Sequence, residues 1–392
     1  MHRIILKRHE DKRITRGHRW VFSNEIDSVS GDPRTGDIVA VVSAAGKFIG
    51  CGFYHPHSLI AVRILSHRET GPADGFIRER IGAAFDLRMA LFPGCESYRL
   101  VHGESDDLPG LIVDRYGDCC SLQILSAGME LHLPAVCDAI QAVLPCRTIV
   151  ERNESPLRVL EGLEQRKGVI RGEAGPVTIT EHGIKYTVDL LEGQKTGLFL
   201  DQRENRYAVR RYAAGRDVID CFCNDGGFAL NTAAGGAKSV TGIDISETAV
   251  ARASGNAAAN GFAGNAEFIA ADVFEYLKTA GAGGKKFGLV ILDPPSFAKN
   301  KKTVRKAIRG YRQLHTLALP LIPDGGYLAT ASCSHHIFEE TFRDIIRDAA
   351  EAAGRSLTLL EWRGASPDHP TIPAMPETGY LKFGIYRVGA PV

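Results

Sequence analysis

The sequence predicts an α/β protein whose C-terminal half forms a doubly wound, Rossmann-like sheet, preceded by a small β-rich domain and a small α+β domain. Three observations support this fold class. Short apolar strands alternate with helices from Asp217 onward, which is typical of a parallel sheet covered by helices on both faces. The first unit, residues 217–244, reads as strand, glycine-bearing turn, helix and strand. Two late strands, at 356–362 and 381–386, follow the alternating part.

The remaining elements follow from local periodicity. In the C-terminal part, strands are expected at 218–220, 239–244, 266–270, 289–293 and 326–332, and a helix at 338–353. Upstream, we expect hairpins at 36–42 with 48–54 and at 177–180 with 184–189, helices at 75–91 and 130–143, and strands at 111–118, 120–125 and 148–151. Residues 70–74 read as a linker. We therefore expect domains at 1–70, 75–175 and 176–392.

The turn of the first βαβ unit indicates which ligand the sheet binds. A dinucleotide site uses Gly-x-Gly-x-x-Gly to bring backbone amides against a pyrophosphate. This chain has Gly226 and Gly227 instead, and Asp220 stands at the strand end. A carboxylate is a poor neighbour for phosphate and a good one for the ammonium group of S-adenosylmethionine, while Asp244 could accept both ribose hydroxyls. The pattern favours a methyl-donor site over a nicotinamide site, which stays an alternative.

Composition and charge limit the class of protein. Hydrophobic residues make up 44% of the 392 positions and charged residues 24%, ordinary values for a globular chain. No apolar run approaches the ~20 residues that span a bilayer, and the N-terminus lacks an apolar signal segment, so we expect a cytoplasmic protein. The nine cysteines show no zinc-site spacing, and no metal is predicted. A net charge of +1 argues against a protein that coats nucleic acid.

Polar residues stand at the ends of the successive strands. They are Asp220, Asp244, Asp272, Asp293 and Cys333. Ligands of open α/β sheets bind beyond the carboxyl ends of the strands. Four acids gathered at one edge would repel one another without a ligand, so we interpret them as a binding site. Asp272 is suited to accept the adenine amino group, with Val273 and Phe274 supplying apolar contact to the ring.

The segment Asp293-Pro294-Pro295-Ser296-Phe297 is the second specific element. Two prolines after a buried strand fix the backbone and remove amide donors. A rigid turn with an acid and an aromatic ring suits a flipped-out base, so Pro294, Pro295 and Phe297 are predicted to form a base pocket. A basic stretch, residues 299–312, follows. Five of its side chains fall on one helical face and are predicted to contact RNA phosphates: Lys302, Arg305, Lys306, Arg309 and Arg312.

Cys333 is the candidate nucleophile. A thiol with an unperturbed pKa of about 8.5 is partly thiolate at neutral pH. Attack on C6 of a pyrimidine would make C5 carbanion-like and able to take a methyl group from a sulfonium, and loss of the C5 proton would then expel the thiol. His335 and His336 follow in the sequence. Whether they raise the thiolate content or are exposed loop residues stays open.

Together these motifs resemble the class I S-adenosylmethionine-dependent ribosomal RNA methyltransferases typified by the bacterial 23S rRNA C5-cytosine methyltransferase. The resemblance spans the chain and includes the segments 16–22, 102–114, 197–203, 332–334, 368–370 and 380–383. It implies an N-terminal PUA RNA-binding domain, in which Arg16 and Arg19 contact RNA. It implies Cys333 as the catalytic thiol and Asp293 as the group that binds the base. For the cofactor it implies Gln202, Arg203, Asp220, Phe222, Gly226, Asp244, Asp272 and Asp293.

The resemblance implies that the chain methylates C5 of a cytosine in 23S rRNA, with RNA as its partner and no membrane contact. Ser296 stands where another branch of cytosine methyltransferases has a second cysteine, so Cys333 would act alone. Relatives with the same Asp-Gln-Arg and Asp-Pro-Pro signatures methylate guanine N7. A non-catalytic RNA-binding assembly factor is a further alternative. The target nucleotide and the oligomeric state, with a homodimer among the options, stay open.

Overall fold

The structure is a computed structural model, and it describes residues 1–193, 197–298 and 300–390. The chain forms two compact units. The first comprises Met1–Ile179, Val188–Leu200 and Pro367–Thr378, and the second comprises Thr180–Thr187, Asp201–Ser366 and Gly379–Val392. The three domains predicted from the sequence stay a prediction.

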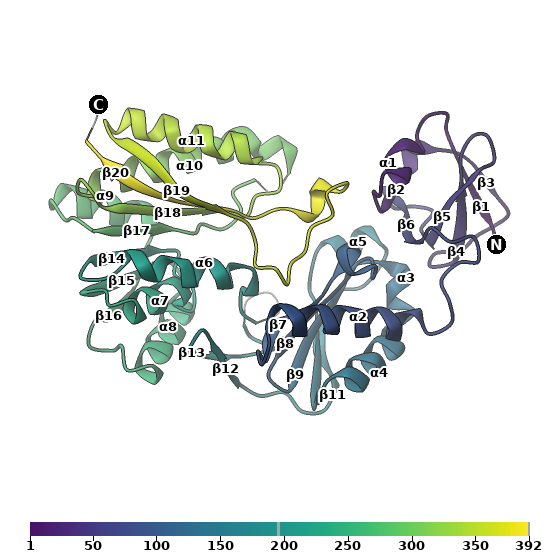
Figure 1. Cartoon of the computed structure of the whole chain (residues 1–392), viewed down its shortest axis with the longest axis horizontal. Coiled ribbons are helices and arrows are strands. Elements are labelled where there is room, and N and C mark those ends of the chain that lie inside the picture. The colour runs from purple at the N-terminus through teal and green to yellow at the C-terminus, as the bar shows by residue number, and fades with distance from the viewer. Residues whose placement is uncertain (194–196, 299, 391–392) are drawn as a thin grey trace. The chain divides into compact units, whose positions relative to one another are not determined.

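The first unit begins with the predicted β-rich domain (Figure 1). Its six-stranded sheet has the order β2-β6-β5-β4-β1-β3. The strands are β1 (Arg3–Leu6), β2 (Trp20–Phe22), β3 (Ile26–Ser30), β4 (Ile38–Val42), β5 (Phe48–Tyr54) and β6 (Ile60–Ser66), with helix α1 (Lys12–Thr15) between β1 and β2. Alternating apolar residues of these strands, among them Val39, Val41 and Val62, form its core.

A five-stranded sheet of order β11-β10-β9-β8-β7 follows in the same unit. Its elements are α2 (Phe76–Leu91), β7 (Ser97–His102), β8 (Leu111–Tyr116), β9 (Cys119–Ile124), α3 (Ala127–Glu130), α4 (Leu133–Val143), β10 (Thr148–Asn153), α5 (Leu157–Leu160) and β11 (Arg166–Arg171). The helix predicted at 130–143 corresponds to α4, which begins three residues later, at Leu133, and follows the short helix α3. Pro134 lies in the first turn of α4, where its missing N–H costs nothing, and it marks a new helix start.

The second unit contains a seven-stranded sheet of order β16-β15-β14-β17-β18-β20-β19. Its strands are β14 (Asp217–Cys221), β15 (Ser239–Asp244), β16 (Ala266–Ala270), β17 (Leu289–Leu292), β18 (Tyr327–Ser332), β19 (Ser356–Arg363) and β20 (Lys382–Gly389). The first five are parallel, whereas β20 pairs antiparallel with β18 and with β19. The predicted fold class is confirmed. The hairpin of β12 (Val177–Glu181) and β13 (Ile184–Val188) precedes this sheet.

Helices cover both faces of this sheet, as Figure 1 shows. They are α6 (Arg203–Ala208), α7 (Gly227–Ala234), α8 (Glu247–Ala259), α9 (Val273–Ala282), α10 (Val304–Ala318) and α11 (Glu339–Ala352). Alternation along the central strand β14 separates two cores. Ile219 packs in the cluster that holds Leu314 of α10 and Phe342 of α11, and Val218 packs in the cluster that holds Phe228 of α7. Both faces of β14 are therefore buried, as expected for a doubly wound sheet.

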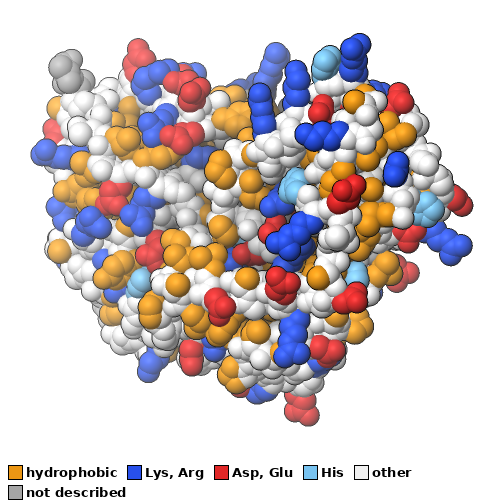
Figure 2. Space-filling view, turned by 45° about the vertical axis from the view of Figure 1, so that its right-hand side comes forward, with side chains coloured by type: hydrophobic (Ala, Val, Ile, Leu, Met, Phe, Trp, Pro, Cys, Tyr) orange, Lys and Arg blue, Asp and Glu red, His pale blue; other side chains and the backbone are white. Residues whose placement is uncertain are grey.

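No helix among the described residues is both long and apolar enough to cross a lipid bilayer. On the face drawn in Figure 2, basic and acidic side chains are interspersed. This mixture agrees with a net charge of +1.

Candidate active site

The predicted strand-end residues come to one edge of the parallel sheet. In the order β16, β15, β14, β17 and β18 they are Asp272, Asp244, Asp220, Asp293 and Cys333. Parallel strands end at the same edge, and neighbouring strands lie about 4.8 Å apart, so the row spans about 19 Å. Asp293 and Cys333 follow the ends of two adjacent strands, because Leu292 pairs with Thr330 in the β17–β18 ladder. The side chains of the row are therefore gathered at one edge.

Asp220 is fully buried at the middle of this row. Its Oδ2 accepts a hydrogen bond from the backbone N–H of Ala229 (2.9 Å), near the start of α7, whereas its Oδ1 is buried without a hydrogen-bond partner. Burial raises the pKa of Asp220 well above its usual range, and the charges of Asp293 and Asp244 add to the rise, although the Ala229 N–H lowers it. A buried carboxylate oxygen without a donor fits a site for a cationic ligand.

The loop between β14 and α7 has an unusual backbone. Phe222 (φ 65°) and Asn224 (φ 46°) have positive φ values, as does Gly226 (φ 81°). Such φ values are unfavourable for residues with a side chain, and they cluster at ligand sites. The Oδ1 of Asn224 is buried without a hydrogen-bond partner. A Cβ at Gly226 would lie 3.2 Å from the ring of Phe268, so both the φ value and the close contact favour glycine here. The residues of this loop fit the binding of S-adenosylmethionine.

Asp244 fixes this loop from the neighbouring strand. Its Oδ2 accepts a hydrogen bond from the N–H of Asn224 (3.0 Å), and its Oδ1 accepts one from Ser246 (2.9 Å). Asp272 is exposed and caps α9 by accepting a hydrogen bond from the N–H of Glu275 (3.0 Å). Val273 is buried in the core, and Phe274 is half-buried. The predicted contacts of Asp244 with ribose and of Asp272 with adenine stay predictions.

Gln202 connects the 197–203 motif to Asp293. Its Nε2 donates a hydrogen bond to Oδ1 of Asp293 (3.0 Å), and its Oε1 accepts one from Nδ2 of Asn205 (2.7 Å). The adjacent Arg203 lies against Glu181, with Nε 3.5 Å from Oε2. Gln202 is thus placed to orient Asp293.

Glu181 is a residue that the sequence reasoning missed. It is buried, and both of its carboxylate oxygens accept hydrogen bonds from Arg206 (2.9 and 2.7 Å). The only sequence signal was a carboxylate next to the turn of the 177–189 hairpin. Because the charge partners lie far along the chain, this signal does not identify the contact.

Hydroxyl groups hold the Asp-Pro-Pro turn against the loop of Cys333. The Oγ of Ser334 lies 3.0 Å from Oγ of Ser296 and 3.1 Å from the hydroxyl of Tyr311, to which Ser332 also donates (3.0 Å). Burial raises the pKa of Tyr311 to about 12, so the phenol stays protonated. Cys333 itself is half-buried. Of this cluster the sequence indicated the thiol, while Tyr311 and the serine contacts became evident only in the structure.

The residues predicted to form a base pocket belong to this turn. Pro294 is buried, Pro295 is exposed and Phe297 is half-buried. The ring of Phe297 lies 4.7 Å from that of Tyr311, centroid to centroid. These contacts make the turn rigid. Its role in holding a base stays a prediction.

Several basic side chains of α10 and of the turn before it are exposed. Lys302, Arg305, Lys306 and Arg309 are exposed, while Ala307 and Tyr311 on the other face are buried. Arg312 forms an ion pair with Asp348 (2.8 Å). Lys299 of the predicted basic stretch lies outside the described residues. In the first unit Arg16 is exposed, and Arg19 pairs with Asp107 (2.7 Å).

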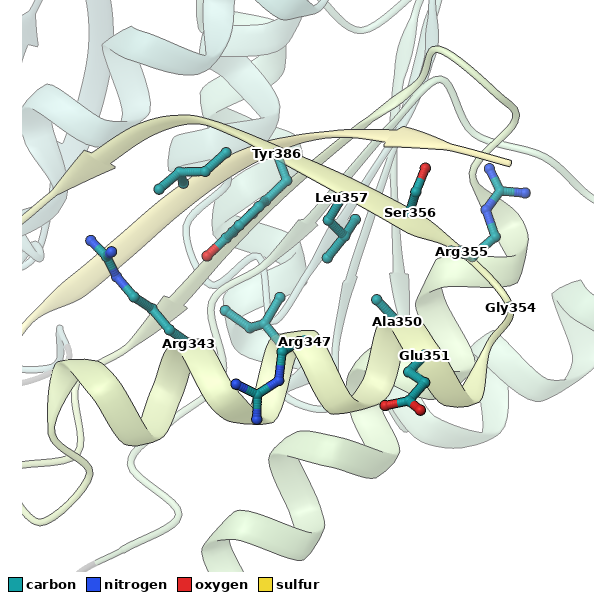
Figure 3. A pocket seen from close by; sticks show the side chains of 11 residues that line it. Arg343, Arg347, Ala350, Glu351, Gly354, Arg355, Ser356, Leu357 and Tyr386 are labelled. Carbon is teal, nitrogen blue, oxygen red and sulfur yellow. The ribbon is translucent and has the colours of Figure 1, made fainter. Parts of the chain in front are cut away.

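A pocket of about 530 Å³ lies elsewhere in the second unit, between α11 and the strands β19 and β20 (Figure 3). Ser356 and Leu357 in its lining pair with Gly389 and Val388, near the amino-terminal edge of the parallel strands. Its arginines are engaged with acids: Arg343 with Glu339, Arg347 with Asp344 and Asp348, and Arg355 with Asp324. This pocket is therefore separate from the row of strand-end acids.

Comparison with known proteins gives two family matches. Residues 4–67 match the PUA-like domain, and residues 170–382 match the S-adenosylmethionine-dependent methyltransferase domain. "Ribosomal RNA large subunit methyltransferase I" of Klebsiella pneumoniae is 39% identical, and that of Aeromonas hydrophila 41% identical, each alignment covering 98% of both chains. The solved structure of SMU.776, a methyltransferase complexed with SAH, shares the fold with a TM-score of 0.85 at 22% identity, covering 99% of this chain and 100% of that one.

Proposed function

The chain belongs to the family of S-adenosylmethionine-dependent methyltransferases to which ribosomal RNA large subunit methyltransferase I belongs, and from this premise we propose that it forms 5-methylcytidine in 23S ribosomal RNA. The observation that carries this proposal is the adjacency of Asp293 and Cys333. They follow neighbouring strands at the edge that also holds Asp220 and Asp244. A nucleophile beside the donor site is what methylation of a pyrimidine carbon requires, because C5 is not nucleophilic by itself.

The methyl donor would be held by the β14–α7 loop and the acids next to it. Asp220 would face the ammonium group, Asp244 the ribose and Asp272 the adenine, with Phe222 and Gly226 shaping the loop. Gln202 and Arg203 would close this side of the site. When bound, S-adenosylmethionine supplies an electrophilic methyl group.

In the proposed reaction the Cys333 thiolate attacks C6 of the cytosine, and the electron pair of the C5–C6 double bond becomes available at C5. After C5 is methylated, loss of its proton restores the double bond and breaks the sulfur–carbon bond. Asp293 would bind the base, and in its protonated form could donate a proton to it. Pro294, Pro295 and Phe297 would limit how the base enters.

RNA binding would involve both units. The PUA-like domain would contribute Arg16 and Arg19. The exposed basic face of α10 begins within a few residues of the Asp-Pro-Pro turn, which supports a role in holding phosphates next to the target base. A homodimer stays a prediction, and light scattering of the purified protein tests it.

The test is product analysis with matched cysteine variants. Wild type, Cys333→Ala, Cys333→Ser and the control Cys95→Ala are incubated with 23S rRNA and S-adenosylmethionine, and the modified nucleosides are identified by mass spectrometry. Cys95 is half-buried like Cys333 but belongs to the first unit. We expect 5-methylcytidine from wild type and the control, none from either Cys333 variant, and S-adenosylmethionine binding by all four.

Three outcomes would contradict the proposal. Full transfer by Cys333→Ala, or 7-methylguanosine as the wild-type product, would replace the covalent scheme with guanine N7 methylation. A wild-type protein that binds RNA but neither binds S-adenosylmethionine nor transfers a methyl group would act as a non-catalytic assembly factor.

A further inference from the structure

Lys382 is a buried amine at the loop that carries Cys333. The residue is only 7% exposed, and the β18–β20 ladder pairs it with Ser332, the last residue of β18. Its Nζ donates hydrogen bonds to the carbonyl oxygens of Ser334 (2.8 Å) and Tyr380 (2.7 Å). Ser334 is the residue directly after Cys333, so these bonds hold the amine at the loop that carries the thiol.

The hydrogen bonds leave one position on this nitrogen for a proton. A neutral amine has two N–H groups and a lone pair, and the two carbonyl oxygens can take both N–H groups. Burial lowers the pKa of Lys382 to about 8, while the negative charge of a Cys333 thiolate raises it. A free thiol ionises with a pKa of about 8.5. The amine is therefore partly neutral near pH 8, and its lone pair can then take a proton.

We propose that Lys382 is the charge partner of Cys333, taking the thiol proton on Nζ and holding the resulting thiolate beside an ammonium group. Sulfur keeps the electron pair of the broken S–H bond, the proton forms the third N–H bond, and the total charge of the pair does not change. Lys382 acts on the base only through the sulfur and is a positioning residue. The use of the thiolate in catalysis rests on the proposed function, but the ionisation of the thiol can be measured without RNA.

A Cys333 thiolate needs a nearby positive charge because of the other ionisable groups at this edge of the sheet. The Asp293 carboxylate, at the end of β17, would repel the negative charge of a Cys333 thiolate. Tyr311 of α10 is protonated at neutral pH, because burial raises its pKa to about 12. His335 and His336 lie in the same loop. A buried ammonium group offsets the Asp293 carboxylate over a wider pH range than an imidazole does.

The test measures how fast iodoacetamide alkylates Cys333 as a function of pH, with the Cys333 peptide quantified by mass spectrometry. The full-length wild type is compared with Lys382→Met and with the control Lys286→Met. Lys286 is exposed in the same unit and donates to the carbonyl of Pro320 (2.7 Å). We expect the midpoint for Lys382→Met to rise by about one pH unit, which is about tenfold slower alkylation at pH 7. The control should match wild type.

An unchanged midpoint in a Lys382→Met protein that still binds S-adenosylmethionine overturns the proposal. If that variant fails to fold, Lys382→Arg decides, because it keeps the positive charge. A midpoint at or below that of wild type supports the charge partnership, and a raised midpoint overturns it. The product of the methylation assay is an independent result. A shifted midpoint together with 7-methylguanosine as the product would contradict the C5 reaction but support the Lys382–Cys333 pair. Formation of 5-methylcytidine with no shift of the midpoint would contradict only the role of Lys382.

Discussion

Replacing Asp220 with asparagine tests whether this carboxylate is held for a cationic ligand. The amide has the same shape and its oxygen can still accept the hydrogen bond from the N–H of Ala229. The negative charge is lost, and an NH2 group takes the place of Oδ1, which is buried without a hydrogen-bond partner. A hydrogen bond to a charged group contributes about 1.5–3 kcal/mol. We therefore expect Asp220→Asn to bind S-adenosylmethionine about 10- to 150-fold more weakly than wild type.

The same substitution should stabilise the ligand-free protein. Burial raises the pKa of Asp220 well above its usual range. In the unfolded chain this carboxyl group ionises at about pH 4. Between that pH and the pKa in the folded protein, Asp220 is protonated in the folded state and ionised in the unfolded state. Folding stability then falls as pH rises through this window. Asparagine has no proton to lose, so the variant should gain about 1 kcal/mol near neutral pH relative to wild type. For a unit of this size that raises Tm by about 2–4 °C.

Two measurements check these expectations. Calorimetric titration with S-adenosylmethionine at pH 6, 7 and 8 gives the affinity, and thermal unfolding without ligand gives Tm over the same range. Asp217→Asn is the matched control, since Asp217 lies on the same strand but its side chain is 42% exposed. The control should change stability by less than about 0.5 kcal/mol. Unchanged affinity combined with a lower Tm in Asp220→Asn would refute the reasoning.

Two further predictions concern RNA binding and stability. Changing the exposed basic residues of α10 and of the turn before it (Lys302, Arg305, Lys306 and Arg309) to glutamine should weaken RNA binding and lower the slope of log K against log salt by about 3, since each phosphate contact on a single strand contributes about 0.7. Filter binding at several salt concentrations measures the slope, and an unaltered slope would exclude these residues from the interface. Glu181→Ala should reduce the free energy of unfolding by about 3–5 kcal/mol, because buried Arg206 and Arg203 lose their carboxylate. Urea unfolding tests this, and a loss below 1 kcal/mol would be evidence against it.

Local pattern was enough to predict the C-terminal sheet. Strands such as 239–244 and 266–270 were predicted at the positions where β15 and β16 occur, because a short apolar run that ends at an acid or a turn is a local signal. The helix expected at 130–143 occurs as α4, and only its start differs, because Pro134 lies in the first turn of a new helix that is separate from α3. Elsewhere the predicted boundaries differ from the observed ones by a few residues.

The contacts that support the candidate site are not local. Gln202 reaches Asp293 across 91 positions, and the amine of Lys382 reaches the Ser334 carbonyl across 48. Neither Glu181 nor Tyr311 stood out in the sequence. A buried glutamate and a buried tyrosine have the same local pattern whether they pair with a functional residue or only fill the core.

The sequence by itself determined the order of the strands along the chain and the kind of residue that ends each one, because both depend on apolar periodicity and on residues close in sequence. It also determined which chemical groups were available, namely four carboxylates and a thiol. The tertiary structure decided which of these groups became neighbours, since the order β16-β15-β14-β17-β18-β20-β19 differs from the order along the chain. It also decided burial, which raises the pKa of Asp220 and lowers that of Lys382, because desolvation depends on all the atoms that pack around a charge.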